Sequence, residues 1–260
     1  MTPANKTHPI HRYKSGQYHQ TDDPVVVEQS VSLTVNGSVW ITFMCTPSDI
    51  EALAAGFLFN ENIISSQQEI EDLRICEHED NIDIWLDRSI TQPENWRRTS
   101  GCTGGYTSAV LEEVQPLPAD SLQLTPDQVL ALITGLLESQ ELYRQSGGVH
   151  SSALTSPEKI LLKVEDVGRH NTLDKIAGRL LLEEIPAPQR ILLTTGRISS
   201  EMLQKAVRMK VSVLISRTSP TSLSIELAHQ LGITLIGYAR GHRFNVYAHP
   251  ERIIQNSPQT

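Results

Sequence analysis

The chain has 260 residues, of which 39% are hydrophobic and 20% charged, and these proportions are those of a folded globular protein rather than a disordered one. Its 22 basic and 30 acidic residues give a formal net charge of −8, which argues against a general affinity for nucleic acid or for anionic membranes. Aromatic residues make up only 5%, which disfavours a stacking surface for single-stranded nucleic acid.

The three cysteines, Cys45, Cys76 and Cys102, are too few and too scattered for a disulfide framework, which indicates a reducing compartment. Residues 1–24 are polar and lack the apolar segment of a secretory signal. No apolar run in the sequence approaches the ~20 residues needed to span a bilayer. We therefore expect a cytoplasmic protein without a membrane segment, whose residues 1–24 form a disordered tail.

Ordered structure is expected to begin at residue 25. Apolar residues alternate with polar ones on both sides of Asn36-Gly37, which predicts a β-hairpin because both turn positions need a positive φ. Thr46-Pro47-Ser48-Asp49 predicts the start of a helix that ends near Asn60, with Thr46 as its cap. Two more strands are predicted, at Ile70–Cys76 and Ile82–Leu86. Residues 25–115 are thus expected to form a smaller α+β domain that ends in the loop around Cys102.

Residues 116–260 show a different pattern. A periodic helix is predicted to start at Thr125-Pro126, and beyond Gly147 short apolar strands alternate with helices, which is typical of α/β layers around a largely parallel sheet. The expected strands are Ile160–Val164, Ile191–Leu193, Val211–Ile215, Ile233–Ile236 and Phe244–Tyr247, and the expected helices are Leu173–Leu182, Glu201–Met209 and Ser222–Leu231. We predict a larger C-terminal α/β domain of three layers, in a chain that is α+β overall.

The common nucleotide and metal motifs are missing from the sequence. There is no G-x-G-x-x-G, no Walker A loop, no C-x-x-C and no H-E-x-x-H. The nine histidines share no ligand spacing with the cysteines. We therefore expect no zinc and no other metal.

Cys102 differs from the other two cysteines in its surroundings. It is flanked by glycines and follows Arg97 and Arg98, and both accessibility and nearby positive charge favour a reactive thiolate. The alternative is an unreactive surface cysteine in a flexible loop. Cys45 and Cys76 lie at the ends of apolar strands and are expected to be small core residues.

Three segments place arginines where a strand meets the next element. Arg169, in Glu165–Asn171, and Arg197, in Thr194–Ser200, each lie between a predicted strand and a helix, where anions gather at helix N-termini. The third segment, Tyr238-Ala239-Arg240-Gly241-His242-Arg243, offers an aromatic face and two guanidinium groups that suit a purine joined to a diphosphate. Solvated turns without a ligand are the alternative for all three.

Several segments together resemble the FdhD family, the formate dehydrogenase accessory sulfurtransferases, over nearly all of Val25 to Arg252. In chain order they are Met44–Asp49 with Ala54–Leu58, Gly147–His150, Glu165–Lys175, Pro220–Ser222, Gly237–Tyr247 and His249–Arg252.

This resemblance implies a homodimeric sulfur carrier whose C-terminal domain is similar in fold to cytidine deaminases but lacks their zinc. Such a protein takes sulfur from a cysteine desulfurase as a persulfide. It then passes the sulfur to the bis(molybdopterin guanine dinucleotide) molybdenum cofactor of formate dehydrogenase. The persulfide cysteine corresponds to Cys102, and the cofactor-binding stretch corresponds to Tyr238, Ala239, Arg240, Gly241, His242 and Arg243, to which we add Arg169 from its strand-end position.

The sequence departs from the family pattern at Gly105, where many members carry the second cysteine of a C-x-x-C. Without it, sulfur cannot leave Cys102 as an internal disulfide forms, so transfer has to be direct or use an outside thiol. A sulfurtransferase with Cys102 as carrier is the favoured function. A cofactor-binding chaperone in which Cys102 is dispensable remains open, and a nucleotide-modifying hydrolase is disfavoured by the missing metal ligands.

Overall fold

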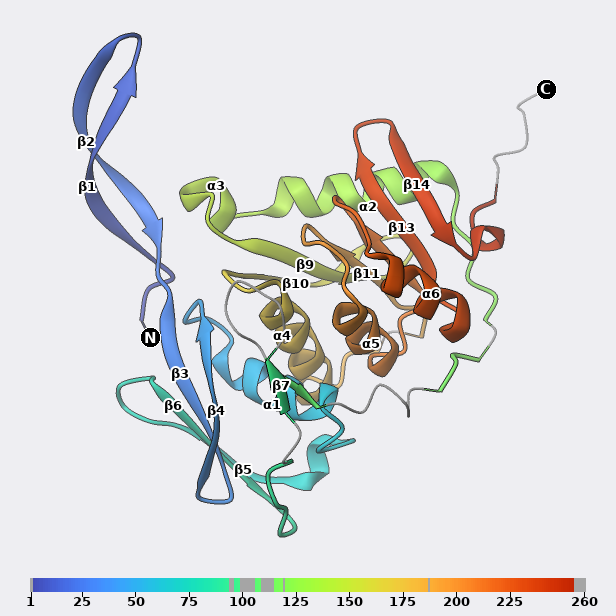
Figure 1. The fold of residues 1–260 in the computed structure, drawn as a ribbon, viewed down its shortest axis with the longest axis horizontal. Coiled ribbons are helices and arrows are strands. Elements are labelled where there is room, and N and C mark those ends of the chain that lie inside the picture. The colour runs from blue at the N-terminus through green and yellow to red at the C-terminus, as the bar shows by residue number, and fades with distance from the viewer. Residues whose placement is uncertain are drawn as a thin grey trace.

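The computed structural model describes residues 2–93, 96–98, 106–108, 115–118, 120–186 and 188–254. It contains two main sheets (Figure 1), one with the strand order β4-β3-β6-β5 and one with the order β10-β9-β11-β12-β13-β14. Two further strand pairs are separate from them: β1 with β2, and β7 (Trp96–Arg98) with β8 (Tyr106–Ser108). The α/β and α+β character predicted from the sequence is confirmed.

The smaller sheet consists of β3 (Gln29–Val35), β4 (Ser38–Cys45), β5 (Ile70–Ile75) and β6 (Asn81–Leu86), and α1 (Ile50–Asn60) packs on it. The predicted hairpin is confirmed, since Asn36 and Gly37 have φ values of 47° and 79°. The prediction that Thr46 caps the helix is wrong. Asp49 takes the N-cap position with a φ of 48°, because Thr46 is buried in a contact with the C-terminal half.

The larger sheet is mixed rather than largely parallel. Only the neighbouring pairs β11–β12 and β12–β13 are parallel, because α5 and α6 connect these strands. The pair β9–β11 is antiparallel, and short connections make the outer pairs β9–β10 and β13–β14 antiparallel too. Its strands are β9 (His150–Thr155), β10 (Ile160–Asp166), β11 (Ile191–Thr194), β12 (Val213–Ser216), β13 (Thr234–Arg240) and β14 (Arg243–Ala248). The helices of this half are α2 (Pro126–Ser139), α3 (Leu142–Ser146), α4 (Arg169–Leu182), α5 (Ser200–Arg208) and α6 (Ser222–Leu231), and the short 3-10 helices of the chain are η1 (Gln67–Glu69) and η2 (Pro250–Arg252).

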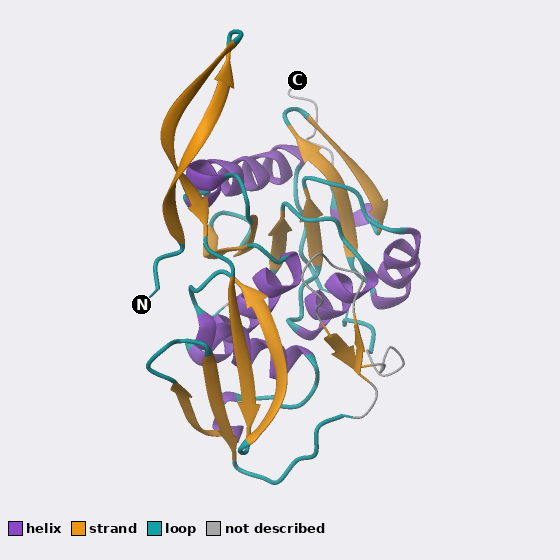
Figure 2. Ribbon diagram, turned by 60° about the vertical axis from the view of Figure 1, so that its left-hand side comes forward, coloured by secondary structure: helices purple, strands orange, loops and turns teal. Residues whose placement is uncertain are grey.

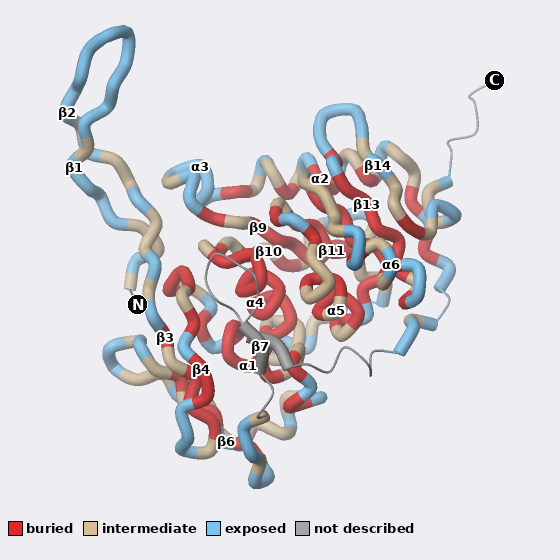
Figure 3. Tube along the Cα trace, viewed as in Figure 1, coloured by how far each residue is buried: buried red, intermediate tan, exposed pale blue. Residues whose placement is uncertain are grey.

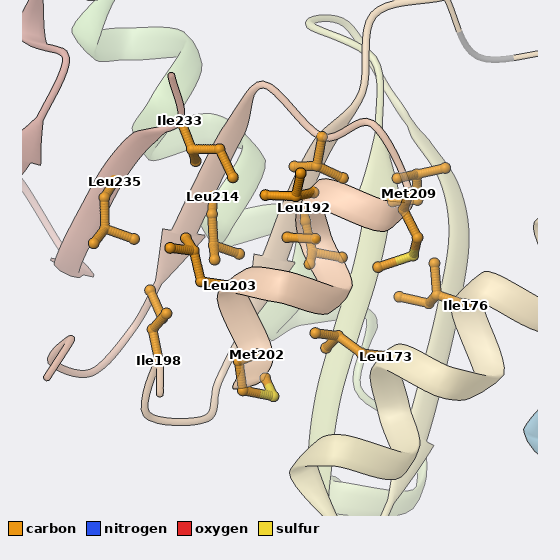
Figure 4. Close-up of a cluster of buried hydrophobic side chains, with 14 of the residues drawn as sticks. Leu173, Ile176, Leu192, Ile198, Met202, Leu203, Met209, Leu214, Ile233 and Leu235 are labelled. Carbon is orange, nitrogen blue, oxygen red and sulfur yellow. The ribbon is translucent and has the colours of Figure 1, made fainter. Parts of the chain in front are cut away.

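The C-terminal half has three layers, with α2 on one face of the sheet and α4, α5 and α6 on the other (Figure 2). Alternate residues of each strand face opposite layers. Leu192 and Leu214 pack against Leu203 of α5 and Leu173 of α4 (Figure 4), while Ile191 faces the α2 side. The similarity to cytidine deaminases and the domain boundary between residues 115 and 116 stay predictions. No helix in the described ranges combines the length and the apolar character needed to cross a membrane.

The two halves meet where α1 crosses α4. A Cβ added at Gly56 would lie 1.8 Å from the carbonyl oxygen of Asp174, and one added at Gly178 would lie 1.9 Å from that of Ala52. Because no side chain fits at either position, the two helix backbones touch directly. The halves are therefore held in one fixed relative placement.

The prediction of a disordered tail is wrong, because β1 (Asn5–Lys14) and β2 (Gln17–Val26) form a regular antiparallel hairpin. Its turn uses Ser15 and Gly16, with φ values of 53° and 85°, and the rings of Tyr13 and Tyr18 meet at a tilted angle with their centroids 5.1 Å apart. The hairpin projects from the molecule and is exposed over most of its length (Figure 3). Neither strand has an apolar face, which is why the sequence pattern did not reveal it.

Candidate functional site

Three parallel strands bring their carboxyl ends to one edge of the larger sheet, which we call the carboxyl edge. The pairing register sets Thr194 of β11 beside Ser216 of β12, and Ile215 beside Ile236 of β13. Helices α4, α5 and α6 follow strands that end here, so their N-termini lie at the same edge. Strand carboxyl ends and helix N-termini together are where open α/β sheets bind anionic ligands.

The loops of the carboxyl edge are tied to one another by hydrogen bonds. The Ser216 hydroxyl donates to the carbonyl of Gly196 at 2.7 Å, and the Gly196 N–H donates to Thr194 Oγ1 at 3.1 Å. The Tyr238 N–H donates to the carbonyl of Thr218 at 2.9 Å. The three loops thus form one connected surface.

Four exposed arginines gather at the carboxyl edge. They are Arg197, Arg217, Arg240 and Arg243. Within the described residues none of the four forms an ion pair. In a chain with a formal charge of −8, a group of exposed arginines without carboxylate partners is a local attractor for anions. Sequence reasoning missed Arg217, although its place directly after a strand was the available signal.

The predicted segment from Tyr238 to Arg243 does not form a free turn but closes the hairpin between β13 and β14. Tyr238 is 39% exposed and has a φ of 53°, an unusual conformation for a bulky residue that a neighbouring bulge in the pairing accommodates. Ala239 is completely buried in the core, so it is not accessible to a ligand. Gly241 and His242 form the exposed tip. The aromatic ring and the arginines therefore reach solvent together.

Arg169 lies at the same edge but is only 8% exposed. A Cβ added at Gly196 would lie 3.0 Å from the Arg169 Cβ, so Gly196 is required for this close approach. The positive charge of Arg169 contributes to lowering the pKa of both His150 and His170. The predicted Arg169 is thus placed beneath the surface that carries the other arginines.

A buried acid–base pair stands beside Arg169. His170 Nε2 lies 3.1 Å from a carboxylate oxygen of Glu201 and 3.4 Å from the Ser199 hydroxyl. Burial lowers the pKa of His170, and the positive charge of Lys205 lowers it further. The hydrogen bond to Glu201 raises the pKa, but these two effects outweigh it. Burial alone would raise the pKa of Glu201, but the bond from His170 and nearby cations lower it overall. At neutral pH His170 is therefore neutral and Glu201 is ionised.

Sequence reasoning did not include His150, His170 or Glu201 among the site residues. Burial, with a contribution from Arg169, also lowers the pKa of His150. The only sequence signals were the segments Gly147–His150 and Glu165–Lys175, which carry both histidines. Within the described ranges, no three His, Cys, Asp or Glu side chains come together as a metal site.

The segment Glu165–Asn171 has a structural task that the sequence did not indicate. Asp166 is completely buried, forms an ion pair of 2.6 Å with Lys175, and accepts the Thr46 N–H at 3.1 Å. Asn171 does not cap α4 but donates to Asp166 and to the carbonyl of Met44, both at 2.8 Å. This motif therefore connects the two halves, and only its Arg169 and His170 face the carboxyl edge.

The cysteines are placed as follows. Cys45 is fully buried, as predicted, and burial with the nearby Asp166 charge raises its pKa to about 12, so it is chemically inert. The prediction that Cys76 is a core residue is wrong: it is half-buried in a turn, where its sulfur accepts the Asn81 N–H at 3.2 Å. Cys102 lies outside the described residues, in the connection between β7 and β8.

Comparisons with known proteins find similar proteins that match almost the whole chain. The family model described as the FdhD/NarQ family matches residues 26–254. Proteins named sulfur carrier protein FdhD are similar: one from Staphylococcus haemolyticus is 37% identical and one from Bacillus subtilis 36%, each over 94% of this chain and 95% of the relative. A crystal structure described as a "putative formate dehydrogenase accessory protein" from Desulfotalea psychrophila matches with a TM-score of 0.83 and 32% identity, over 97% of this chain and 100% of that one.

Proposed function

Because the chain belongs to the FdhD/NarQ family, we propose that it is a sulfur carrier that serves formate dehydrogenase. In this proposal Cys102 receives sulfur from the persulfide of a cysteine desulfurase, whose own cysteine leaves as a thiolate, and so becomes a persulfide itself. The outer sulfur of that persulfide is then passed to the bis(molybdopterin guanine dinucleotide) molybdenum cofactor, the substrate of the transfer, which would supply the electron pair of the new bond while Cys102 leaves as a thiolate. Similarity to sulfur carrier proteins over 94% of the chain supports the carrier role.

The cofactor would bind at the carboxyl edge. Its guanine dinucleotide parts are anionic diphosphates that end in purines, and the exposed ring of Tyr238 with the guanidinium groups of Arg240 and Arg243 offers a stacking face and charge-assisted donors. Arg197 and Arg217 extend the positive surface along the edge. The observation that carries this part is the group of exposed arginines that have no carboxylate partner among the described residues.

The buried groups beneath this surface would set its charge. With His170 neutral and Glu201 ionised, Arg169 is the positively charged member of these three, and it lies next to Gly196. Glu201 is bonded to His170 and is thereby kept from competing for the exposed arginines. We further propose that the protein acts in the cytoplasm as a homodimer.

The deciding experiment is the intact mass of the protein after incubation with a cysteine desulfurase and cysteine. A gain of one sulfur atom in the wild type and in Cys76→Ala, but not in Cys102→Ala, is expected. Cys102→Ala should also fail to activate formate dehydrogenase while it still binds GDP. If Cys102→Ala activates the enzyme like the wild type, the protein is a cofactor-binding chaperone and not a carrier.

A further inference from the structure

A cavity of about 210 Å³ lies at the ends of α4 and α5 that are distant from the carboxyl edge. Its lining combines apolar side chains, among them Phe59, Leu180 and Leu181, with three cationic ones, Arg190, Arg208 and Lys210. Phe59 and Ser65 belong to the N-terminal half and the other lining residues to the C-terminal half, so the cavity lies between the halves. No carboxylate of the described residues is part of the lining.

Arg208 is the best-defined cation of this cavity. Its Nη2 donates to the carbonyl of Phe59 at 3.1 Å and to Asn62 Oδ1 at 2.5 Å, and the guanidinium lies over the Phe59 ring, 5.6 Å from its centroid. The Nε–H is buried and has no hydrogen-bond partner in the part of the chain that the structure describes. The two hydrogen bonds and the ring contact thus fix the guanidinium at the wall of the cavity.

The charge of Arg208 is also incompletely compensated. Burial lowers its pKa, and the attraction of Glu61, which acts in the opposite direction, does not offset this. Arg190 is likewise partly buried, and burial lowers its pKa too, while its Nη1 donates to the carbonyl of Met209 at 2.6 Å. An anion in the cavity would therefore gain from the Arg208 guanidinium without displacing a carboxylate of the lining.

The apolar part of the lining decides which anion fits. An apolar cavity of about 150 Å³ is large enough to hold benzene, so 210 Å³ accommodates a ring that carries one carboxylate. Inorganic phosphate would leave the side chains of Phe59, Leu180 and Leu181 uncovered. We propose that this cavity binds a small organic carboxylate with an apolar body about the size of a phenyl ring. This inference is independent of the proposed sulfur transfer.

Isothermal titration calorimetry on the full chain with three probes tests the proposal. Benzoate has the charge and the ring, benzamide has nearly the same shape without the charge, and acetate has the charge without the ring. We expect benzoate to bind at least ~10-fold more tightly than either, because each of the others lacks one of the two favourable contacts. Similar affinities for benzoate and benzamide, or no binding of benzoate at millimolar concentrations, would overturn the proposal.

Two variants locate the binding. Arg208→Gln should weaken benzoate at least ~10-fold and leave benzamide unchanged, because it removes the charge and keeps a donor. Ser65→Trp, at an exposed position of the lining, should block both probes, whereas the exposed Ser89→Trp should change neither. Since Ser65 is exposed, this variant keeps its fold even if Arg208→Gln does not. If benzoate binds to Ser65→Trp as tightly as to the wild type, the cavity is not the ligand site. The arginines then only stabilise the C-terminal ends of the helices by their positive charge.

Discussion

Lys175 Nζ lies 2.6 Å from Asp166 Oδ2, and both side chains are completely shielded from solvent. The same ammonium donates to the carbonyl of Thr46 at 2.9 Å, so one buried pair of charges joins α4 to the segment that precedes α1. Replacing one partner of such a pair leaves the other charge buried without compensation.

We therefore predict that Lys175→Met lowers the free energy of unfolding by about 3–5 kcal/mol. Urea denaturation followed by circular dichroism measures the change. Lys159→Met, at an exposed position, is the matched control and should stay within about 0.5 kcal/mol of the wild type. A loss below about 1 kcal/mol in Lys175→Met would show that the pair does not hold the halves together.

The helix crossing gives a second prediction. Gly178→Ala should cost about 3 kcal/mol or more, because its Cβ would lie 1.9 Å from the backbone oxygen of Ala52 and no rotamer can relieve this. Gly135→Ala in α2 is the control: the nearest atom is Ile160 Cδ1 at 3.8 Å, so the change should stabilise by about 0.5–1 kcal/mol. Thermal unfolding of both variants measures the two changes in stability, which should have opposite signs. Equal changes would contradict the direct contact of the two helix backbones.

The pH dependence of stability follows from the buried histidines. The folded protein lowers the pKa of His170 and His150, so below their ordinary value near 6.5 the unfolded chain binds more protons. Stability is therefore complete above pH 6.5 and is lost as pH falls, by at most about 1.4 kcal/mol per pH unit for each histidine.

His170→Gln should make the loss of stability between pH 7 and pH 5 less steep. The lowered pKa of Glu201 acts in the same direction, but at more acidic pH. His8→Gln on the exposed hairpin is the control and should keep the wild-type slope. Urea midpoints at four pH values measure it, and a steeper slope in His170→Gln would contradict the prediction.

The arginines of the carboxyl edge should govern nucleotide binding. Arg240→Ala and Arg243→Ala are each expected to weaken GDP binding by about 1.5–3 kcal/mol, the range for charge-assisted hydrogen bonds. Added salt should weaken the wild type as well. Arg74→Ala, an exposed arginine of β5, should have no effect. Unchanged GDP affinity in both edge variants would move the site to Arg197 and Arg217.

The thiols of Cys45 and Cys76 should differ in their reactivity because they differ in accessibility. With a pKa of about 12, Cys45 is ionised at pH 8 in only about one molecule in ten thousand, and it is fully buried. Iodoacetamide at pH 8 should therefore leave Cys45 unmodified in the native protein and modify it in urea, while the half-exposed Cys76 reacts in both. Peptide mapping by mass spectrometry distinguishes them. Native labelling of Cys45 at the rate of Cys76 would contradict its burial.

Elements with a local signal were predictable from the sequence. The helix Ser222–Leu231 has the predicted bounds, since Thr221 caps it and Gly232 ends it with a positive φ. Strand β9 was missed because its inward residues Ser151 and Ser152 are polar, and they are buried through hydrogen bonds to other side chains, such as that of Ser152 to Thr172 at 2.7 Å. Such partners are distant in sequence and leave no periodic pattern.

The candidate site was predictable in part for the same reason. The rule that ligands gather at strand ends indicated Arg197 and Tyr238–Arg243 correctly as residues of one edge. It could not show that Asp166 and Asn171 turn toward the N-terminal half, since Thr46 and Met44 lie more than a hundred residues away. Nor could it show that Glu201 meets His170, because that contact depends on how α5 packs beside α4.

The pairing of β7 with β8 limits how far Cys102, the proposed sulfur carrier, can move relative to these two strands. Arg98 is the register partner of Tyr106, and Cys102 is four residues from each along the chain. Since an extended residue spans at most about 3.5 Å, the covalent chain keeps the Cα of Cys102 within about 14 Å of the Cα atoms of both. If Cys102 carries the sulfur, as proposed above, donor and acceptor must both come within that radius of the β7–β8 pair. A partner that docks elsewhere on the protein then has to bring its own reactive group to Cys102.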